Sequence, residues 1–170
     1  MDATNHYSAK GVSFDYPAGW EERRARWWDL NPVRARQAAR KEGMELLVVC
    51  QDLKRPRSVW SSLKGGWRPG ALATVLRNSQ LLKEGTLEDV IRRSHKSEHV
   101  TIEKQTHIQG QVSFRFTYTS PSGEEIPQQL MFATKDGRLV YEVRCFAPDA
   151  AEYEDNRAAF DLILVSFRIA

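Results

Sequence analysis

The sequence has no long apolar run, and none approaches the roughly 18 residues that a membrane-spanning helix needs. Its first ten residues, Met1 to Lys10, are polar and do not provide the apolar segment of a signal peptide. We therefore expect a soluble protein without a transmembrane segment. Two locations stay open, the cytoplasm or the bacterial envelope after removal of a leader peptide, and the sequence does not decide between them.

Cysteine is scarce as well, with only Cys50 and Cys145 in the whole chain. Each lies inside an apolar, strand-like run, so we expect buried free thiols that pack as small hydrophobic side chains. Two cysteines are too few to indicate a disulfide framework, although a bridge between them in an exported protein stays open. Cys145 has no obvious base partner, so the sequence does not single it out as a catalytic thiol.

Catalytic motifs are equally sparse. No serine stands in a Gly-x-Ser-x-Gly elbow, and the glycine-rich segment 64–70 lacks the residue order of a phosphate-binding loop. We therefore expect no catalytic residue and no cofactor. The exception is His95-Lys-Ser-Glu-His99, which fits the H-x-x-E-H pattern of a zinc hydrolase, with His95 and His99 as ligands and Glu98 as general base. Strand-like sequence resumes at Val100, so we expect His99 at or beyond the end of its helix, which weakens this alternative.

What the sequence does contain is the composition of a globular domain. Its 170 residues are 41% hydrophobic and 28% charged, which suits one domain over 1–170 with its own core. Alternating apolar and polar residues predict strands over 100–108, 112–118, 126–134 and 139–146. Turn signals separate them at Gly110, at 120–123 and at Asp136-Gly137, the last as a two-residue hairpin turn. The second half therefore predicts a four-stranded antiparallel meander.

Helical signals stand on both sides of this meander. Thr86-Leu-Glu-Asp89 resembles a capping box and predicts a helix over 86–97. Asp149 caps a second, C-terminal helix, because its side chain can accept a first-turn N–H. That helix carries an apolar stripe that predicts packing on the sheet, formed by Tyr153, Phe160, Ile163, Leu164 and Phe167.

The first half gives fewer signals. Alternation over 11–16 and the continuous apolar run 45–50 predict two more strands, which we expect in the same sheet as the meander. Short helices are predicted over 33–42 and 71–83. The segments 21–43 and 51–70 are otherwise polar and irregular.

The two ends of the chain carry short packing motifs. Gly11-Val-Ser-Phe-Asp-Tyr-Pro-Ala-Gly-Trp20 runs an apolar strand into a Tyr-Pro-x-x-Trp corner, and residues 160–167 end a helix in Ser-Phe. These motifs resemble PsbP-like and Mog1-like (DcrB-like) domains, and the order of elements between them agrees. The resemblance implies an α+β fold, an antiparallel sheet with helices on both faces in an α/β/α sandwich, and a C-terminal helix packed on the sheet. The chain departs from the pattern at 21–43 and 51–70.

The resemblance also implies a binding or assembly module. Members of this superfamily include a photosystem accessory subunit, a binder of a nuclear-transport GTPase, bacterial envelope lipoproteins and chaperones for secreted toxins. The shared motifs are packing motifs, so no functional residue of those proteins can be placed on this sequence.

Positive charge and tryptophan are concentrated in one part of the chain. Residues 20–70 carry 12 Lys/Arg against 6 Asp/Glu and hold all five tryptophans, whereas the remainder carries 13 against 16. Arg and Trp are enriched in binding hot spots, because they combine large contact area with directional polar groups. The residues predicted to bind a partner are Arg23, Arg24, Arg26, Trp27, Trp28, Arg34, Arg36, Trp60, Trp67 and Arg68.

The leading hypothesis is a non-catalytic binding or assembly domain, accessory or chaperone-like, that engages a protein partner through 21–70 as a monomer or weak dimer. A metal-dependent hydrolase using His95, Glu98 and His99 is one alternative. A nucleic-acid binder is another, since arginines contact phosphates and aromatic rings stack on bases. A pI of about 8.9 and the lack of a recognition motif count against nucleic acid. It also stays open that the tryptophans cap the core while the arginines are solvated.

Overall fold

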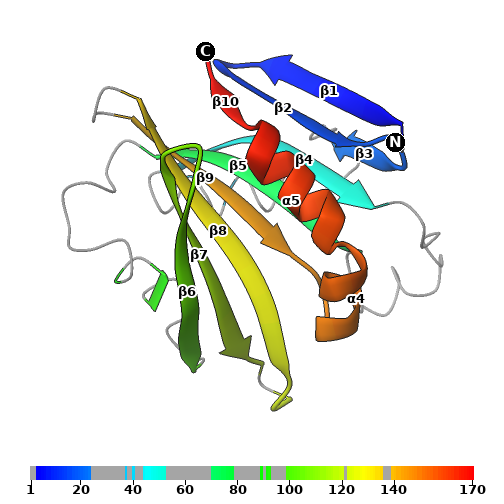
Figure 1. Ribbon diagram of the computed structural model, residues 1–170, viewed down its shortest axis with the longest axis vertical. Coiled ribbons are helices and arrows are strands. Elements are labelled where there is room, and N and C mark those ends of the chain that lie inside the picture. Colours follow the sequence, from blue (N-terminus) through cyan, green and yellow to red (C-terminus); the bar gives the residue numbers. More distant parts are fainter. Residues whose placement is uncertain are drawn as a thin grey trace.

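The computed structural model describes residues 3–23, 37, 40, 44–52, 70–78, 89, 91–92, 99–120, 122–135 and 139–170. Within them, the chain forms a seven-stranded and a three-stranded antiparallel sheet, and the helices near its C-terminus pack against both (Figure 1). This is the α+β architecture that the sequence predicts.

The larger sheet has the strand order β3-β4-β5-β9-β8-β7-β6. Its strands are β3 (Trp20–Arg23), β4 (Met44–Asp52), β5 (Leu72–Asn78), β6 (Val100–Ile108), β7 (Gln111–Thr119), β8 (Glu125–Lys135) and β9 (Leu139–Phe146). The strands β6 to β9 are the predicted meander, and β4 is the predicted strand at 45–50. In Figure 1 the meander curves away from the helices toward the lower edge of the molecule.

The smaller sheet was predicted only in part. The expected strand at 11–16 is β2 (Val12–Pro17), but it pairs with β1 (Thr4–Ala9) and β10 (Arg168–Ile169). The prediction that this strand joins the meander is therefore wrong. The alternation in this strand still marks one buried face, because Val12, Phe14 and Tyr16 are buried. They pack in the core between the small sheet, the C-terminal helix and the large sheet.

Two hairpin turns depend on glycine. Lys10-Gly11 joins β1 to β2, Gln109-Gly110 joins β6 to β7, and φ is positive at all four residues. Two-residue turns of type I′ need positive φ at both positions, and glycine adopts it without steric cost. The turn at Gly110 confirms a prediction, whereas the turn at Gly11 was not foreseen because β1 was not.

The predicted C-terminal helix is divided in two. Asp149 caps α4 (Ala150–Asp155) and accepts a hydrogen bond of 2.8 Å from the amide of Glu152, as predicted. After Asn156 the chain continues as α5 (Arg157–Ser166). Every member of the predicted apolar stripe is buried, although Phe167 lies just beyond α5. No helix formed by the described residues has the length and apolarity needed to cross a bilayer.

Three further helices were predicted, and their outcomes differ. The helix predicted over 71–83 is wrong, because Leu72–Asn78 forms β5. Of the helix predicted over 33–42, only Gln37 and Arg40 are described, and both are helical. Of the helix predicted over 86–97, the described residues Asp89, Ile91 and Arg92 are helical, and the capping residue Thr86 lies outside them.

One turn differs from its prediction in length. Lys135 pairs with Leu139, so the connection between β8 and β9 has three residues and not two. Those residues, 136–138, include the predicted Asp136-Gly137 turn and lie outside the described part of the chain.

The two faces of the large sheet carry separate cores. Met131 in β8 packs with Phe160 and the small sheet on the helix-side face, which is the face that α4 and α5 cover. The adjacent Leu130 points the other way and packs with Phe114, Phe132 and Ile91 on the opposite face. The helical segment at Ile91 therefore lies on the face opposite α4 and α5, which gives the sheet helices on both faces.

Candidate functional site

All but one of the predicted partner-binding residues belong to the two long segments that precede and follow β4 in the sequence. Arg23 is the last residue of β3 and pairs with Val49 in β4. The other predicted residues lie outside the described part of the chain, namely Arg24, Arg26, Trp27, Trp28, Arg34, Arg36, Trp60, Trp67 and Arg68. The strand ends that bracket them are described, and they fix where each connection starts and ends.

We call residues 24–43 and 53–69 the two basic connections. The first enters β4 at Met44 and the second leaves β4 at Asp52, at opposite ends of a nine-residue strand. At about 3.3 Å per residue these two points are about 25 Å apart. The other end of the first connection follows Arg23, which pairs with Val49, only three residues from Asp52, so the sheet places the start of the first connection much nearer to the second than its end.

The charge asymmetry of the sequence is larger when the basic region is counted without the strands that it contains. The two basic connections carry eleven Lys/Arg and two Asp/Glu, whereas the rest of the chain carries 14 Lys/Arg and 20 Asp/Glu. Positive charge is thus concentrated in 37 of the 170 residues, on a protein that is otherwise acidic.

One of the five tryptophans belongs to the core. Trp20 in β3 is 5% exposed, and its ring meets that of Phe160 edge to face, with the centroids 5.8 Å apart. The proposal that tryptophans cap the core is therefore right for Trp20. The other four, Trp27, Trp28, Trp60 and Trp67, all belong to the two basic connections.

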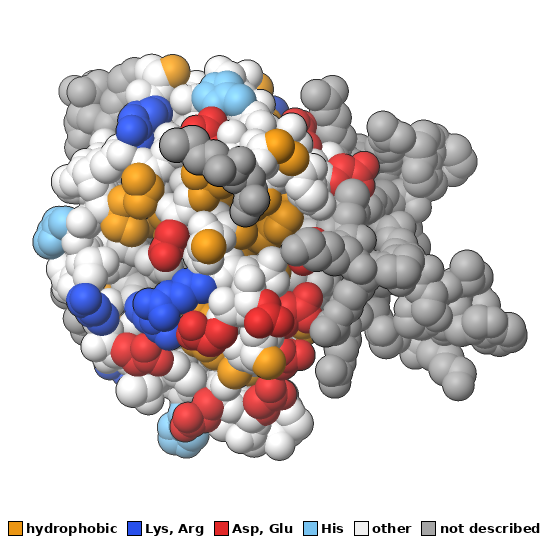
Figure 2. All heavy atoms as spheres, turned by 45° about the vertical axis from the view of Figure 1, so that its right-hand side comes forward, with side chains coloured by type: hydrophobic (Ala, Val, Ile, Leu, Met, Phe, Trp, Pro, Cys, Tyr) orange, Lys and Arg blue, Asp and Glu red, His pale blue; other side chains and the backbone are white. Residues whose placement is uncertain are grey.

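The end of the second connection meets an acidic helix. A Cβ on Gly70 would lie 3.2 Å from the main-chain oxygen of Asp52 and 3.5 Å from Oε1 of Glu152 in α4. Both acids are buried, and α4 adds the exposed Glu154 and Asp155. Figure 2 shows several acidic side chains gathered on the lower part of the face that carries α4 and α5.

Of the predicted histidine motif, His99 alone lies in the described part of the chain. His99 is exposed and lies directly before β6, where its carbonyl oxygen accepts a 2.9 Å hydrogen bond from the amide of Thr119. It therefore extends the strand pairing and is not helical, whereas His95 and Glu98 lie outside the described residues. Within the described ranges, no three His, Cys, Asp or Glu side chains come together as metal ligands.

Both cysteines are free and buried, as the sequence predicts. Cys50 and Cys145 each pair with Ala73, from opposite sides of β5. They are thus two strand spacings apart, about 10 Å, and a disulfide needs Cα atoms within about 7 Å. Burial, with a smaller contribution from Glu22, raises the pKa of Cys50 to about 12, and burial also raises the pKa of Cys145. Protonated, inaccessible thiols are not nucleophiles.

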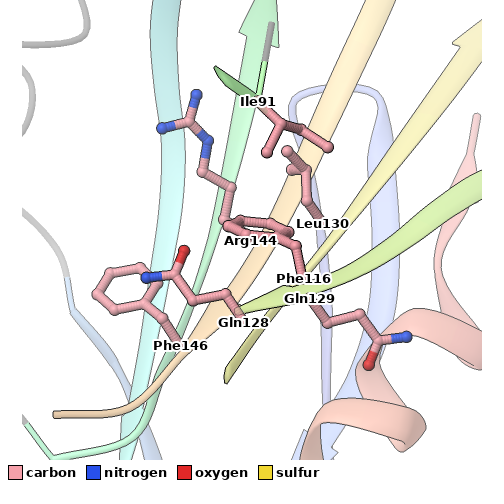
Figure 3. A pocket seen from close by; sticks show the side chains of 7 residues that line it. All are labelled: Ile91, Phe116, Gln128, Gln129, Leu130, Arg144 and Phe146. Carbon is pink, nitrogen blue, oxygen red and sulfur yellow. The ribbon is translucent and has the colours of Figure 1, made fainter. Parts of the chain in front are cut away.

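A hollow of about 190 Å³ lies on the opposite face of the large sheet, against β7, β8 and β9. The described residues that line it are Ile91, Phe116, Gln128, Gln129, Leu130, Arg144 and Phe146. Phe116, Gln128 and Phe146 form one row across three strands, with Gln128 between the two rings. The side chain of Gln129 points away from the others in Figure 3, so this residue lines the hollow with its main chain.

An ion pair adjoins the hollow. Arg144 donates from Nε and Nη2 to one carboxylate oxygen of Glu142, at 2.8 and 2.5 Å, and the Glu142 side chain is 0% exposed. The two residues are two apart in β9 and so share a face. Neither residue was predicted as a site residue, because a Glu-x-Arg pair in a strand usually marks a solvated face. The available signal was that both charges fall on the same face as Phe146.

No protein-family model and no curated protein matches the chain. Solved structures do, beginning with the solution structure of cyanobacterial PsbP (CyanoP) from Synechocystis, at 17% identity and a TM-score of 0.56, over 100% of this chain and 94% of that one. LpqN, involved in cell envelope biogenesis of Mycobacterium tuberculosis, matches at 11% identity and a TM-score of 0.54, over 100% of this chain and 91% of that one. A protein of Bacteroides thetaiotaomicron matches at 10% identity and a TM-score of 0.52, over 100% of this chain and 49% of that one.

At these identities the similarity concerns the fold. The alignment extends over the whole chain, including the Tyr16-Pro17 corner and the segment 160–167 that carry the resemblance. The chain therefore has the PsbP-like α+β fold.

Proposed function

We propose that the chain is a non-catalytic binding or assembly domain that engages an acidic protein surface through the two basic connections. The observation that carries the proposal is the concentration of eleven Lys/Arg and four tryptophans in 37 residues, against two acids. Arg and Trp are enriched among the hot-spot residues of protein interfaces. A basic surface also accelerates encounter with an acidic partner, and this effect weakens as salt is added.

The fold supports this class of function. CyanoP is a cyanobacterial PsbP, and LpqN is involved in cell envelope biogenesis. Domains of the PsbP type include accessory and assembly proteins, which work by binding other proteins. An accessory role for this chain rests on that likeness of fold together with its own charge distribution.

The use of Trp20 in the core supports a separate role for the others. A β-strand position next to Phe160 accounts for Trp20 completely. Trp27-Trp28, Trp60 and Trp67 lie in sequence without strand-like alternation and among arginines. Such interleaving of aromatic and guanidinium groups suits a contact surface.

Matched charge-reversal variants test the proposal. One variant combines R24E and R26E with W27A and W28A, and a second combines R57E and R68E with W60A and W67A. The control combines R157E and R168E, which reverses two exposed arginines outside the connections. We expect in-cell crosslinking and mass spectrometry to recover the same partner with wild type and control, and to lose it with at least one connection variant. An unchanged partner in both connection variants would show that the connections are not the interface.

The same variants separate a protein partner from nucleic acid. We expect no steeply salt-dependent binding of a fluorescent single-stranded oligonucleotide by the wild type. A log–log salt slope of several units, lost in the connection variants, would replace the protein partner with nucleic acid.

A further inference from the structure

The hollow lies between Ile91 and the strands β7, β8 and β9, and all of its described lining residues belong to these elements or to the helical segment at Ile91, outside the two basic connections. Its wall is mainly apolar, with the side chains of Ile91, Phe116, Leu130 and Phe146. An apolar cavity of about 150 Å³ holds one benzene molecule, and drug-sized pockets begin near about 300 Å³. A volume of about 190 Å³ therefore suits one ring or one branched alkyl group with a small polar head.

Two polar side chains in this wall, those of Arg144 and Gln128, have hydrogen-bonding groups that no described residue engages. Arg144 uses Nε and Nη2 for Glu142, and Nη2 also lies 4.0 Å from Sδ of Met44. Among the described residues, no acceptor meets Nη1 of Arg144, and no hydrogen bond engages the side-chain amide of Gln128. Gln128 and Arg144 are diagonal neighbours on adjacent strands, close enough to contact one small molecule. One offers donors only, and the other offers a donor and an acceptor.

The charge of Arg144 is already compensated. Glu142 is completely buried and accepts two hydrogen bonds from the guanidinium, so a buried carboxylate already faces this cation. A carboxylate ligand would bring a second negative charge to one guanidinium, beside two phenyl rings. Placing an uncompensated charge in apolar surroundings is costly, whereas a neutral acceptor is not.

We propose that this hollow binds a small uncharged molecule that joins one branched alkyl group or single ring to an amide. The apolar group packs between Phe116, Phe146 and Ile91. The amide carbonyl accepts from Nη1 of Arg144, and the amide N–H donates to the side-chain oxygen of Gln128. Glu142 sets the selectivity, because it holds the guanidinium in place and cancels its charge.

A pair of probes with one carbon skeleton tests the site. The amide 3-methylbutanamide and the carboxylate 3-methylbutanoate are titrated separately into the ¹⁵N-labelled full chain near neutral pH. We expect saturable shifts with the amide at the Nε–H of Arg144 and at the backbone amides of 128–130 and 144–146. The carboxylate is expected to bind about tenfold more weakly, the effect of one unfavourable charge contact. The proposal is overturned if neither probe gives saturable shifts there, or if the carboxylate binds as tightly as the amide.

Adjacent glutamines provide a matched pair of variants. Gln128→Leu removes the amide in the hollow, and Gln129→Leu makes the same change on the helix-side face, where Gln129 donates to Ser113 at 3.4 Å. We expect Q128L to weaken binding of the amide probe about tenfold and Q129L to leave it unchanged. Equal effects of the two substitutions would mean that the hollow does not hold the probe.

A substitution of Glu142 tests the preference for the amide over the carboxylate. Glu142→Gln keeps the shape of the side chain and leaves Arg144 with an uncompensated positive charge. We expect the preference to reverse in E142Q, so that the carboxylate binds more tightly than the amide. Folding of E142Q is checked by its ¹H–¹⁵N spectrum, and the wild-type probe comparison decides the proposal alone if this variant does not fold. A folded E142Q that still prefers the amide would show that Glu142 does not set the selectivity.

Discussion

Single aromatic side chains join the separate parts of this fold. The Phe160 ring is 0% exposed, lies 5.8 Å from the ring of Trp20 in β3 and 5.2 Å from that of Tyr153 in α4. It therefore joins the edge of the large sheet to both C-terminal helices. The phenyl ring has no polar atom, so the contribution of this side chain is packing alone.

We expect Phe160→Ala to lower the free energy of unfolding by about 3–5 kcal/mol, because it leaves a cavity that aromatic neighbours fill poorly. Urea denaturation followed by tryptophan fluorescence measures the loss. Val165→Ala, on the same helix at a side chain that is 53% exposed, is the matched control and is expected to change stability by less than about 0.5 kcal/mol. Similar losses in the two variants would contradict the packing assigned to Phe160.

The two thiols give the protein a defined alkaline sensitivity. Burial raises the pKa of Cys50 to about 12 and also raises the pKa of Cys145, whereas a thiol in the unfolded chain titrates near about 8.5. Above that value the unfolded chain loses thiol protons that the folded chain keeps. The contribution of the thiols is thus fully present at neutral pH and is lost as pH rises from about 9 toward 12.

From this difference we expect the free energy of unfolding to fall by about 1.4 kcal/mol per pH unit for each thiol, once pH exceeds about 9. Urea denaturation between about pH 8.5 and pH 9.5 measures the slope while tyrosines, with an ordinary pKa near about 10, are still mostly protonated. In the double variant C50A/C145A the slope over this window should be close to zero. If the double variant loses stability as steeply as the wild type, groups other than the thiols are responsible.

At the scale of elements, period-2 alternation predicted the meander, whereas apolar runs without alternation gave one correct strand, at 45–50, and one incorrect helix, at 71–83. Residues 112–118 alternate visibly, and β7 follows the alternation. Ala71 to Leu76 are apolar except for Thr74, and such a run fits a buried helix or a buried strand equally well. The pairing with β4 and β9 on both sides decided in favour of a strand, and that information is not local.

Elements with little apolar content could not be predicted at all. In β1 only Tyr7 is buried, and β10 has two residues. Both strands form because each pairs its backbone N–H and C=O groups with those of β2. The candidate site has the same limit: the composition of 21–70 was visible in the sequence, whereas the hollow depends on Phe116, Gln128 and Arg144 coming from three strands.

Hydrogen exchange should rank the strands by their place in the sheets. We expect the slowest amide exchange in β5, β8 and β9, which are interior strands of the large sheet with buried residues on both faces. The fastest exchange among paired amides is expected in β1, an edge strand with one buried side chain. Exchange measured by NMR at neutral pH gives the order. Protection in β1 equal to that in β9 would mean that the small sheet opens only with global unfolding.

At the scale of the whole molecule, the chain divides into a regular acidic part and two basic connections. The regular part accounts for the fold, its core and the hollow on the opposite face of the large sheet. The connections carry the positive charge, and the acidic side chains of α4 lie near the described end of the second one. This division predicts a protein that orients in an electric field, with the connections facing negative charge.

Cation-exchange chromatography tests that orientation without any knowledge of the partner. R24E/R26E alters the first basic connection, and R157E/R168E alters exposed arginines elsewhere, one of them paired with Glu154. Each pair of substitutions lowers the formal net charge of +3 by four. A charged matrix retains a protein through its most positive surface, so we expect R24E/R26E to elute at clearly lower salt than R157E/R168E. Elution at the same salt would mean that retention follows net charge alone, and that the arginines of the connection do not act as one exposed positive surface.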